Sequence, residues 1–139
     1  MNIVDQLKRD EGIEKSAYID SLGYLTIGVG RLIDAKKGGG LSNEEIDFLL
    51  MNDIRSKESE LSNKVKFYNK LDDARKGVLL NMAFNLGVGG LLKFKNTLRL
   101  VEIGDYKSAS VEMLNSTWAR QVGSRAKRLS KQMLTGEWQ

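Results

Sequence analysis

Acid–base chemistry in this chain near neutral pH must come from carboxylates, lysines or tyrosines. The 139 residues include no histidine and no cysteine. Catalysis by Ser-His-Asp or Cys-His arrangements, disulfides and thiolate metal sites are therefore excluded. Two carboxylates stand out by their surroundings: Glu11 directly precedes Gly12 at the end of a predicted helix, and Asp20 follows a strand-like run just before a turn.

The surroundings of Glu11 and Asp20 predict different pKa values for the two groups. The C-terminal end of a helix carries partial negative charge, which raises the pKa of a carboxyl group such as that of Glu11. Asp20, beside a turn, is expected to stay solvated and ionised. One protonated and one ionised carboxyl group form the acid–base pair of glycoside hydrolysis. Taken alone, the pattern also fits an ordinary helix end and an ordinary turn.

Hydrophobic spacing predicts the elements that hold these two groups. Asn2 is a good N-cap for a first helix that ends at Gly12. Residues 17–20 and 24–29 then alternate around a short turn as a β-hairpin does, and residues 31–33 add a third short strand. A three-stranded sheet of this size needs a helix to cover it.

The rest of the chain is predicted to be helical. Ser42-Asn43-Glu44-Glu45 is a capping box that starts a helix to about residue 62, and the later part of this helix is polar all round, as in a helix that crosses solvent between two lobes. Asp72 caps a largely apolar helix that stops at Gly87. Shorter helices are expected over 91–94, 96–103, 106–115 and 124–134. The predicted fold is α+β and mostly helical, with a small antiparallel sheet. One lobe covers about residues 12–60 and the other about 61–139 plus the N-terminal helix.

The charge of the chain is unevenly distributed. Residues 1–62 carry 8 Lys and Arg against 12 Asp and Glu, whereas residues 63–139 carry 14 against 6, within a net charge of +4. A basic half suits a polyanionic partner such as nucleic acid, a membrane surface or a charged cell wall, although a merely soluble mixed surface has the same composition. Apolar runs fall far short of the ~20 residues of a membrane helix. The N-terminus lacks the pattern of a secretory signal, so none is expected.

The assembled pattern closely resembles the phage-type lysozymes. The spacing Glu-x8-Asp-x5-Thr places Glu11, Asp20 and Thr26 in register with the family, inside the motif that runs from Gly23 to Gly30. The resemblance continues in order over essentially the whole chain, through residues 80–87 and 94–99, Trp118, residues 125–128 and residues 135–138.

The resemblance implies a single lysozyme-like catalytic domain with two lobes and a cleft between them. It implies a muramidase that hydrolyses the β-1,4 bond between N-acetylmuramic acid and N-acetylglucosamine in peptidoglycan, with inversion at the anomeric carbon. Glu11 would then be the general acid, Asp20 the second carboxylate, and Thr26 a residue that holds the attacking water. Without the resemblance, Thr26 is an ordinary β-branched strand residue.

Four further residues receive roles from the same resemblance. Leu32, Phe84 and Thr97 fall at positions that line the sugar cleft, and Arg125 falls where the family has an arginine that pairs with the catalytic glutamate. The alternatives are that Phe84 belongs to the core and that Arg125 belongs to a solvated basic helix face. Trp118 and Trp138 are expected to be packing residues.

The chain departs from the family at three places. Arg31 replaces a histidine after Gly-x-Gly, and we expect it to keep an ion pair, with Asp72 or Asp73 as candidate partners. Glu112 stands where the best-known member has a cleft asparagine. The loop over residues 34–41 is shortened, which leaves the fine specificity open.

The functional expectation is a phage endolysin that acts as a monomer without cofactor or metal, without nucleic acid and without stable membrane insertion. It would accumulate in the host cytoplasm and reach the cell wall through a hole made by a separate phage membrane protein. A lytic transglycosylase typically uses one glutamate, so Asp20 and Thr26 argue against that reading. The alternative from another class is a non-enzymatic basic module that binds cell wall or nucleic acid.

Overall fold

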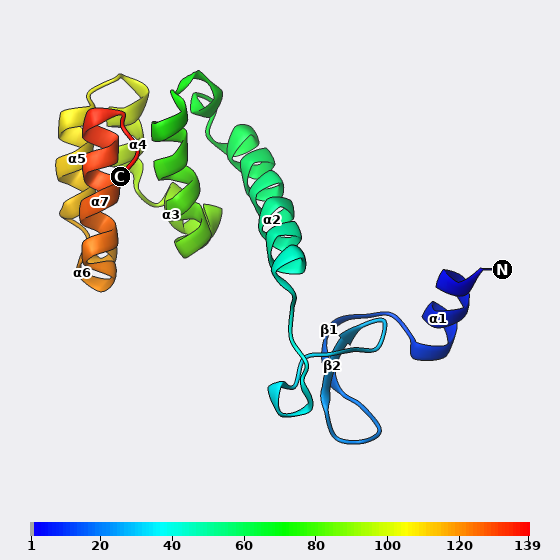
Figure 1. Ribbon diagram of the computed structural model, residues 1–139. Coiled ribbons are helices and arrows are strands. Elements are labelled where there is room, and N and C mark those ends of the chain that lie inside the picture. Colours follow the sequence, from blue (N-terminus) through cyan, green and yellow to red (C-terminus); the bar gives the residue numbers. More distant parts are fainter. Residues whose placement is uncertain (1) are drawn as a thin grey trace. The chain divides into compact units, whose positions relative to one another are not determined.

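The computed structural model describes residues 2–139 (Figure 1). The chain divides into a first compact unit that runs to Leu50 and a second unit, Met51–Gln139. The fold is mostly helical with one small three-stranded antiparallel sheet, as the sequence predicts. Within residues 2–139 no single helix is long and apolar enough to cross a membrane, although one helix pair bent by 100°, Asp73–Leu92 with Lys95–Glu102, has a compatible length and composition.

The first unit contains the N-terminal helix and the sheet. The Asn2 side chain caps the first helix by accepting a hydrogen bond from the Asp5 amide at 3.0 Å, as predicted. The strand order is β1-β2-β3, and Thr26 on the central strand lies opposite both Tyr18 and Leu32. The elements of this unit are α1 (Ile3–Glu11), β1 (Glu14–Ile19), β2 (Leu25–Gly28), β3 (Arg31–Leu32) and the 3₁₀ turn η1 (Ala35–Lys37). The assignment of α1 to the helical lobe stays a prediction.

The long helix α2 (Asn43–Lys64) contains the boundary between the two units. The predicted capping box is present: the Glu45 amide donates to the Ser42 hydroxyl at 3.1 Å, and the Ser42 amide donates to the Glu45 carboxylate at 2.9 Å. These two bonds satisfy backbone donors that the first turn of a helix otherwise leaves free.

The second unit is built from helices. They are η2 (Tyr68–Lys70), α3 (Asp73–Leu92), α4 (Lys95–Glu102), α5 (Tyr106–Leu114), α6 (Thr117–Val122) and α7 (Ser124–Thr135). Within α3 the predicted helix stop at Gly87 is confirmed as a break between two helical segments. Gly87 has φ 74° and ψ 159°, a conformation outside the helical region, and helical backbone resumes beyond it to Leu92. The short helix α6 was not predicted, although Ser116 caps it by accepting from the Ala119 amide at 3.1 Å.

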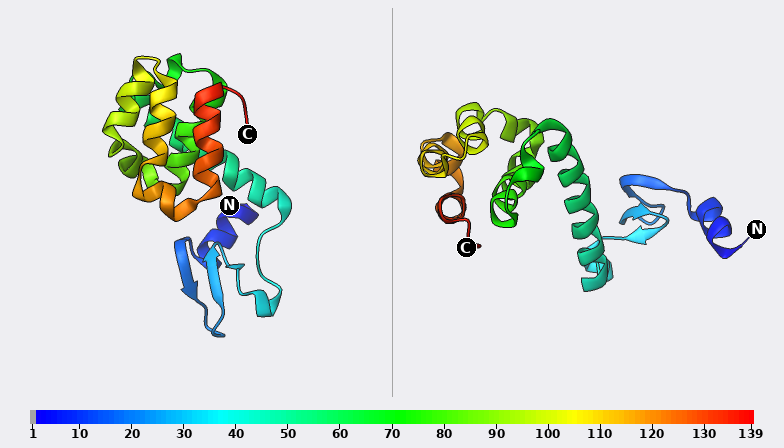
Figure 2. Two further views of the ribbon diagram at one scale, coloured as in Figure 1. Left: turned by 90° about the vertical axis from the view of Figure 1, so that its left-hand side faces the viewer. Right: turned by 90° about the horizontal axis from the view of Figure 1, so that it is seen from above.

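The hydrophobic core lies in the second unit. Its buried apolar side chains fall between Leu61 and Met133, and α3 contributes a buried run that includes Val78, Leu79 and Met82. Helices α5 and α7 pack side by side in this unit (Figure 2). Among residues 2–50, by contrast, Thr26 is the one buried side chain. The second unit therefore supplies most of the hydrophobic stabilisation, at roughly 1.5–3 kcal/mol for each large buried side chain.

Candidate active site

Glu11 is the last residue of α1, as predicted. The helix ends because Gly12 adopts a φ of 80°, with its amide still donating to the Lys8 carbonyl at 3.0 Å. The chain then turns into β1. The Glu11 side chain extends to Gly30, on the turn between β2 and β3, where an added Cβ would lie 2.8 Å from Oε2 of Glu11. The carboxyl group of Glu11 is thus in contact with the backbone of that turn.

Asp20 organises the turn of the β1–β2 hairpin. Its Oδ1 atom accepts hydrogen bonds from the amides of Leu22 at 2.9 Å and Tyr24 at 2.8 Å. Its own amide donates to the Tyr24 carbonyl at 2.8 Å, which closes the turn. Within residues 2–139, Oδ2 of Asp20 accepts no hydrogen bond and is available to a ligand. One carboxylate oxygen therefore holds the loop, and the other is free.

Thr26 is only 3% exposed on the central strand of the sheet. Its hydroxyl donates to the Tyr24 carbonyl at 3.1 Å, which fixes the direction of the proton and leaves oxygen lone pairs to accept from a water or a sugar hydroxyl. Leu32, half-buried, lies opposite Thr26 on β3. Glu11, Asp20, Thr26 and Leu32 therefore all belong to the first unit, on elements joined by the sheet and its turns.

The remaining predicted site residues belong to the second unit. Arg125, at the start of α7, donates from Nε to Oδ1 of Asn81 at 2.9 Å and from Nη2 to the Asn81 carbonyl at 3.3 Å. Phe84 is 38% exposed on α3, and Thr97 is buried at the start of α4. The predicted pairing of Arg125 with Glu11 stays a prediction. Asn81 was not predicted as a partner, although it lies within residues 80–87, one of the segments that resemble the phage-type lysozymes.

A pocket of about 660 Å³ in the second unit has Thr97 among its lining residues. Its lining comes from residues 93–97, Glu112 and residues 115–118, so both Thr97 and the substituted position Glu112 contribute to it. Lys93 and Lys95 lie on the same lining and were not predicted. The pocket combines cationic, anionic and amide groups, which suits a polar ligand.

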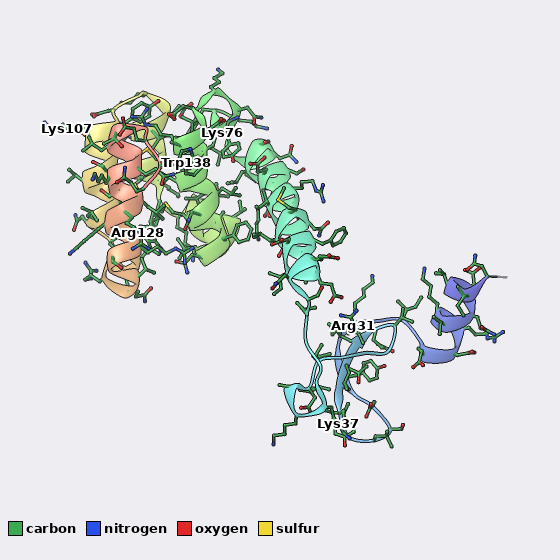
Figure 3. The ribbon with its side chains drawn as sticks, in the orientation of Figure 1. Arg31, Lys37, Lys76, Lys107, Arg128 and Trp138 are labelled. Carbon is green, nitrogen blue, oxygen red and sulfur yellow. The ribbon has the colours of Figure 1, made fainter. Side chains whose placement is uncertain are left out.

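The two tryptophans differ in their surroundings. Trp118 is buried as predicted, with its indole N–H donating to Asn85 at 2.7 Å and its ring edge-to-face with Phe94 at 5.9 Å between centroids. Trp138 is 67% exposed, and Figure 3 shows its position. One edge of its ring lies against Gly77 of α3, so Trp138 packs only in part, whereas the sequence predicts a packing residue.

Arg31 has a partner within the first unit that was not predicted, Glu45. It forms an ion pair with Glu45 at the start of α2 and contacts the Gly40 carbonyl at 3.5 Å, while Asp72 caps α3 and pairs with Arg75 at 3.3 Å. Asp72 and Asp73 belong to the second unit, and the expected pairing of Arg31 with one of them stays a prediction. The Ser42 amide and then the Arg31 guanidinium, both bonded to Glu45, hold the pKa of Glu45 below its usual range.

Within residues 2–139, no three acidic, histidine or cysteine side chains are grouped as a metal site requires. The first unit thus offers two carboxyl groups in distinct settings. Glu11 is at a helix end against a glycine, and Asp20 is fixed by backbone amides. The hydroxyl of Thr26 lies one strand residue beyond the turn.

Residues 8–133 match the family described as phage lysozyme. The chain belongs to the phage lysozyme family. The chain is 31% identical to the probable T4-type lysozyme 1 of Dictyostelium discoideum over 97% of its own length and 95% of that protein. It is 33% identical to the probable T4-type lysozyme 2 of the same organism, with the same coverage.

A third relative of this phage lysozyme chain is the pre-baseplate central spike protein Gp5 of Enterobacteria phage T4. The identity is 29%, over 98% of this chain and 28% of that protein. The chain therefore resembles both free-standing lysozymes and one segment of a larger phage protein. Family membership makes it a lysozyme, a class of glycosidase, and the matched range contains all seven predicted site residues.

Proposed function

We propose that this phage-type lysozyme hydrolyses the β-1,4 bond between N-acetylmuramic acid and N-acetylglucosamine in peptidoglycan. The observation that carries the proposal is the first unit's arrangement of Glu11 and Asp20. One carboxyl group lies at the end of a helix and the other is fixed by turn amides, with one oxygen free. Two carboxyl groups in unlike surroundings are what general acid catalysis of glycoside cleavage requires.

In the proposed reaction Glu11 donates its proton to the glycosidic oxygen as the bond from that oxygen to the anomeric carbon breaks. A water molecule attacks the anomeric carbon from the opposite face, which inverts its configuration. Asp20 accepts the proton that the water loses, and Thr26 holds the water through its hydroxyl oxygen. The hydrogen bond from Thr26 to the Tyr24 carbonyl supports this role, because the hydroxyl donates its proton there and its oxygen lone pairs can still accept a hydrogen bond.

Leu32, Phe84 and Thr97 are proposed to contact the sugar. The pocket around Thr97, with its two lysines and Glu112, supports binding of a charged wall component. Arg125 is proposed to pair with Glu11. The positive charge of residues 63–139 favours anionic wall components by long-range attraction.

We further infer a role in host-cell lysis. The protein would act as a monomer from the host cytoplasm and reach the wall after a separate phage protein opens the membrane. Membership of a phage lysozyme family supports this inference.

A peptidoglycan zymogram with Glu11→Gln tests the proposed acid. An amide has no acidic proton to give to the leaving oxygen, so lysis should disappear while the circular dichroism spectrum and melting temperature stay the same. Glu14→Gln is the matched control, because Glu14 is an exposed glutamate at the start of β1. Near wild-type lysis by folded Glu11→Gln would overturn the proposal.

The products of digestion separate the remaining alternatives. Hydrolysis leaves a reducing muramic acid end, and inversion gives the α-anomer first, whereas a transglycosylase leaves an anhydro end. A binding module would give no product, would bind wall polymer as strongly after Glu11→Gln, and would lose that binding steeply with salt.

A further inference from the structure

The end of the Glu11 side chain occupies the space where a side chain at Gly30 would lie. A Cβ atom at Gly30 would lie 2.8 Å from Oε2, 3.1 Å from the carboxyl carbon and 3.3 Å from Cγ of Glu11. These are the three nearest atoms to that point, and all belong to Glu11. The space that a side chain at residue 30 would occupy is therefore taken by the carboxyl group.

The close approach is specific to Gly30 among the neighbouring glycines of the first unit. Gly12, Gly28 and Gly30 have φ values of 80°, 70° and 68°, a region that L-residues with a side chain rarely adopt. A Cβ at Gly12 or Gly28 would nevertheless meet no atom within 4 Å. Backbone conformation alone therefore explains a glycine at residues 12 and 28, whereas residue 30 must also leave room for Glu11.

Arg31, the residue after Gly30, holds the turn between β2 and β3 in place. Arg31 begins β3, pairs with Ile27 of β2, and forms the ion pair with Glu45 at the start of α2. The Glu45 carboxylate is itself fixed by the Ser42 amide at 2.9 Å. Figure 3 shows Arg31 extending from this strand. The backbone beneath Glu11 is thus connected through Arg31 to the N-terminal turn of a long helix.

We propose that Gly30 and Arg31 are positioning residues for the general acid: Gly30 supplies the surface on which the Glu11 carboxyl group lies, and the Arg31–Glu45 pair holds that surface in place. The proposal rests on the proposed function of Glu11. A catalytic group displaced by about 1 Å can lose on the order of 100-fold in rate, so even a methyl group at residue 30 should be costly to the reaction.

The decisive comparison is Gly30→Ala against Gly28→Ala. Both variants place alanine at nearly the same positive φ, so both should lose similar stability through backbone strain. Only alanine at residue 30 would push the Glu11 carboxyl group away, and this group can move because it ends a flexible side chain. With both proteins fully folded, we expect kcat of Gly30→Ala to fall at least ~10-fold with KM within about twofold, and kcat of Gly28→Ala to stay within about threefold of wild type.

The pH–rate profile supplies a readout that a structural defect would not change. The limb of the kcat profile that reports ionisation of the acid should shift in Gly30→Ala and stay in place in Gly28→Ala. Arg31→Gln should lower kcat by about 3- to 10-fold through loosening of the turn, and Arg31→Lys should restore at least half of the loss because lysine can still pair with Glu45. The comparison of Arg31→Gln with Arg31→Lys tests the proposal even if Gly30→Ala does not fold.

The outcomes are distinguishable from those that test Glu11 itself. If Glu11→Gln is inactive but Gly30→Ala matches Gly28→Ala in kcat and pH profile, the positioning role of Gly30 is wrong and the proposed function stands. Equal loss of kcat in the two alanine variants, or failure of Arg31→Lys to recover more than Arg31→Gln, would likewise overturn the positioning role. Lysis by Glu11→Gln would instead remove the proposed function.

Discussion

The guanidinium group of Arg75 donates from Nε to the backbone oxygen of Met133 at 2.8 Å. Its Nη2 atom donates to the Leu134 carbonyl at 3.1 Å, and the Cζ atom of Arg75 lies 3.6 Å from the centre of the Tyr106 ring. The carbonyls in the last turn of a helix have no partner within that helix. Arg75 therefore joins the start of α3 to the end of α7 by satisfying groups that α7 cannot satisfy itself.

Arg75→Met should destabilise the protein by about 2–4 kcal/mol, because it removes charged hydrogen bonds to the carbonyls of α7 and the stacking on Tyr106 while keeping an apolar stem. Urea unfolding monitored by circular dichroism gives this difference directly. Arg99→Met on the exposed face of α4 is the matched control and should change stability by less than ~0.5 kcal/mol. A loss below ~1 kcal/mol for Arg75→Met would show that the α3–α7 connection matters little.

Asp20 is expected to serve both the hairpin turn and the reaction, and two substitutions separate these roles. Asp20→Asn keeps an oxygen that can accept from Leu22 and Tyr24, so stability should change by less than ~1 kcal/mol while kcat falls by at least ~100-fold. Asp20→Ala should lose activity to a similar degree and in addition lose ~1–2 kcal/mol of stability. Steady-state kinetics on soluble wall fragments, alongside thermal melts, measures both. An active Asp20→Asn enzyme would contradict the role of the charge.

The hydroxyl of Thr26 can be removed with little structural cost. The Tyr24 carbonyl also accepts from the Asp20 amide at 2.8 Å, so it keeps a partner in Thr26→Val, and valine fills the same buried space. We expect a stability change within ~1 kcal/mol, a fall in kcat of ~10- to 100-fold, and retention of most activity in Thr26→Ser. Equal activity of the valine and serine variants would exclude a role for the hydroxyl in holding water.

The Arg31–Glu45 pair predicts a particular dependence of stability on pH. The pKa of Glu45 is lowered by the Ser42 amide and by Arg31, so its contribution is complete above the unfolded carboxyl pKa of about 4.3 and is lost as the pH falls through the lower folded value. Arginine does not titrate in this range, so this pair contributes no slope between pH 6 and 9. In Arg31→His, the pair with Glu45 would raise the histidine pKa, and its contribution would disappear as the pH rises past that value.

Thermal melts of wild type and Arg31→His from pH 3 to 9 test this difference. The wild-type melting temperature should be level between pH 6 and 9 and fall toward pH 3, whereas the histidine variant should lose stability between pH 6 and 8. A larger loss in the wild type than in the variant over pH 6–8 would refute the pairing.

Tyr68 predicts a second, alkaline transition. Burial raises the pKa of Tyr68 to about 12, with a smaller contribution from the negative charge of Glu58. The Tyr68 hydroxyl lies 3.5 Å from Oε1 of Glu58. A raised pKa means that the stabilisation is complete below the unfolded value of about 10 and is lost as the pH rises toward 12. Tyr68→Phe should therefore reduce the fall in melting temperature between pH 10 and 12. An unchanged alkaline fall in the variant would place its origin elsewhere.

Local signals in the sequence predicted the helix starts and the hairpin well. Asn2, the Ser42–Glu45 box and Asp72 all cap helices through the bonds expected of them, because a cap involves residues only three positions apart. The third strand was correctly placed at Arg31. The first strand begins earlier than predicted, at Glu14, where an irregular register with β2 hides the alternation of residue types.

Features that depend on distant contacts were not predicted. The helical segment directly after the Gly87 break, which includes the buried Val88 and Leu91, begins earlier than the predicted helix over 91–94. The Arg31–Glu45 pair depends on how the shortened loop folds, and the contact between Glu11 and Gly30 depends on how the turn after β2 meets the end of α1. The sequence identified the candidate acid, but the surface that supports it came only from the structure.

Because the hydrophobic core runs from Leu61 to Met133 while Thr26 is the one buried side chain among residues 2–50, resistance to local opening should differ sharply along the chain. In native-state hydrogen exchange, amides of α3, α5 and α7 should exchange only through global unfolding, and amides of the β1–β2 hairpin should exchange through smaller, more frequent openings. Glu11 and Asp20 thus lie in a segment with access to partly open states. A protease that cleaves the hairpin would inactivate the enzyme while the helical unit stays folded, so cleavage in that hairpin, rather than melting of the core, should set how long the enzyme stays active in the presence of a protease.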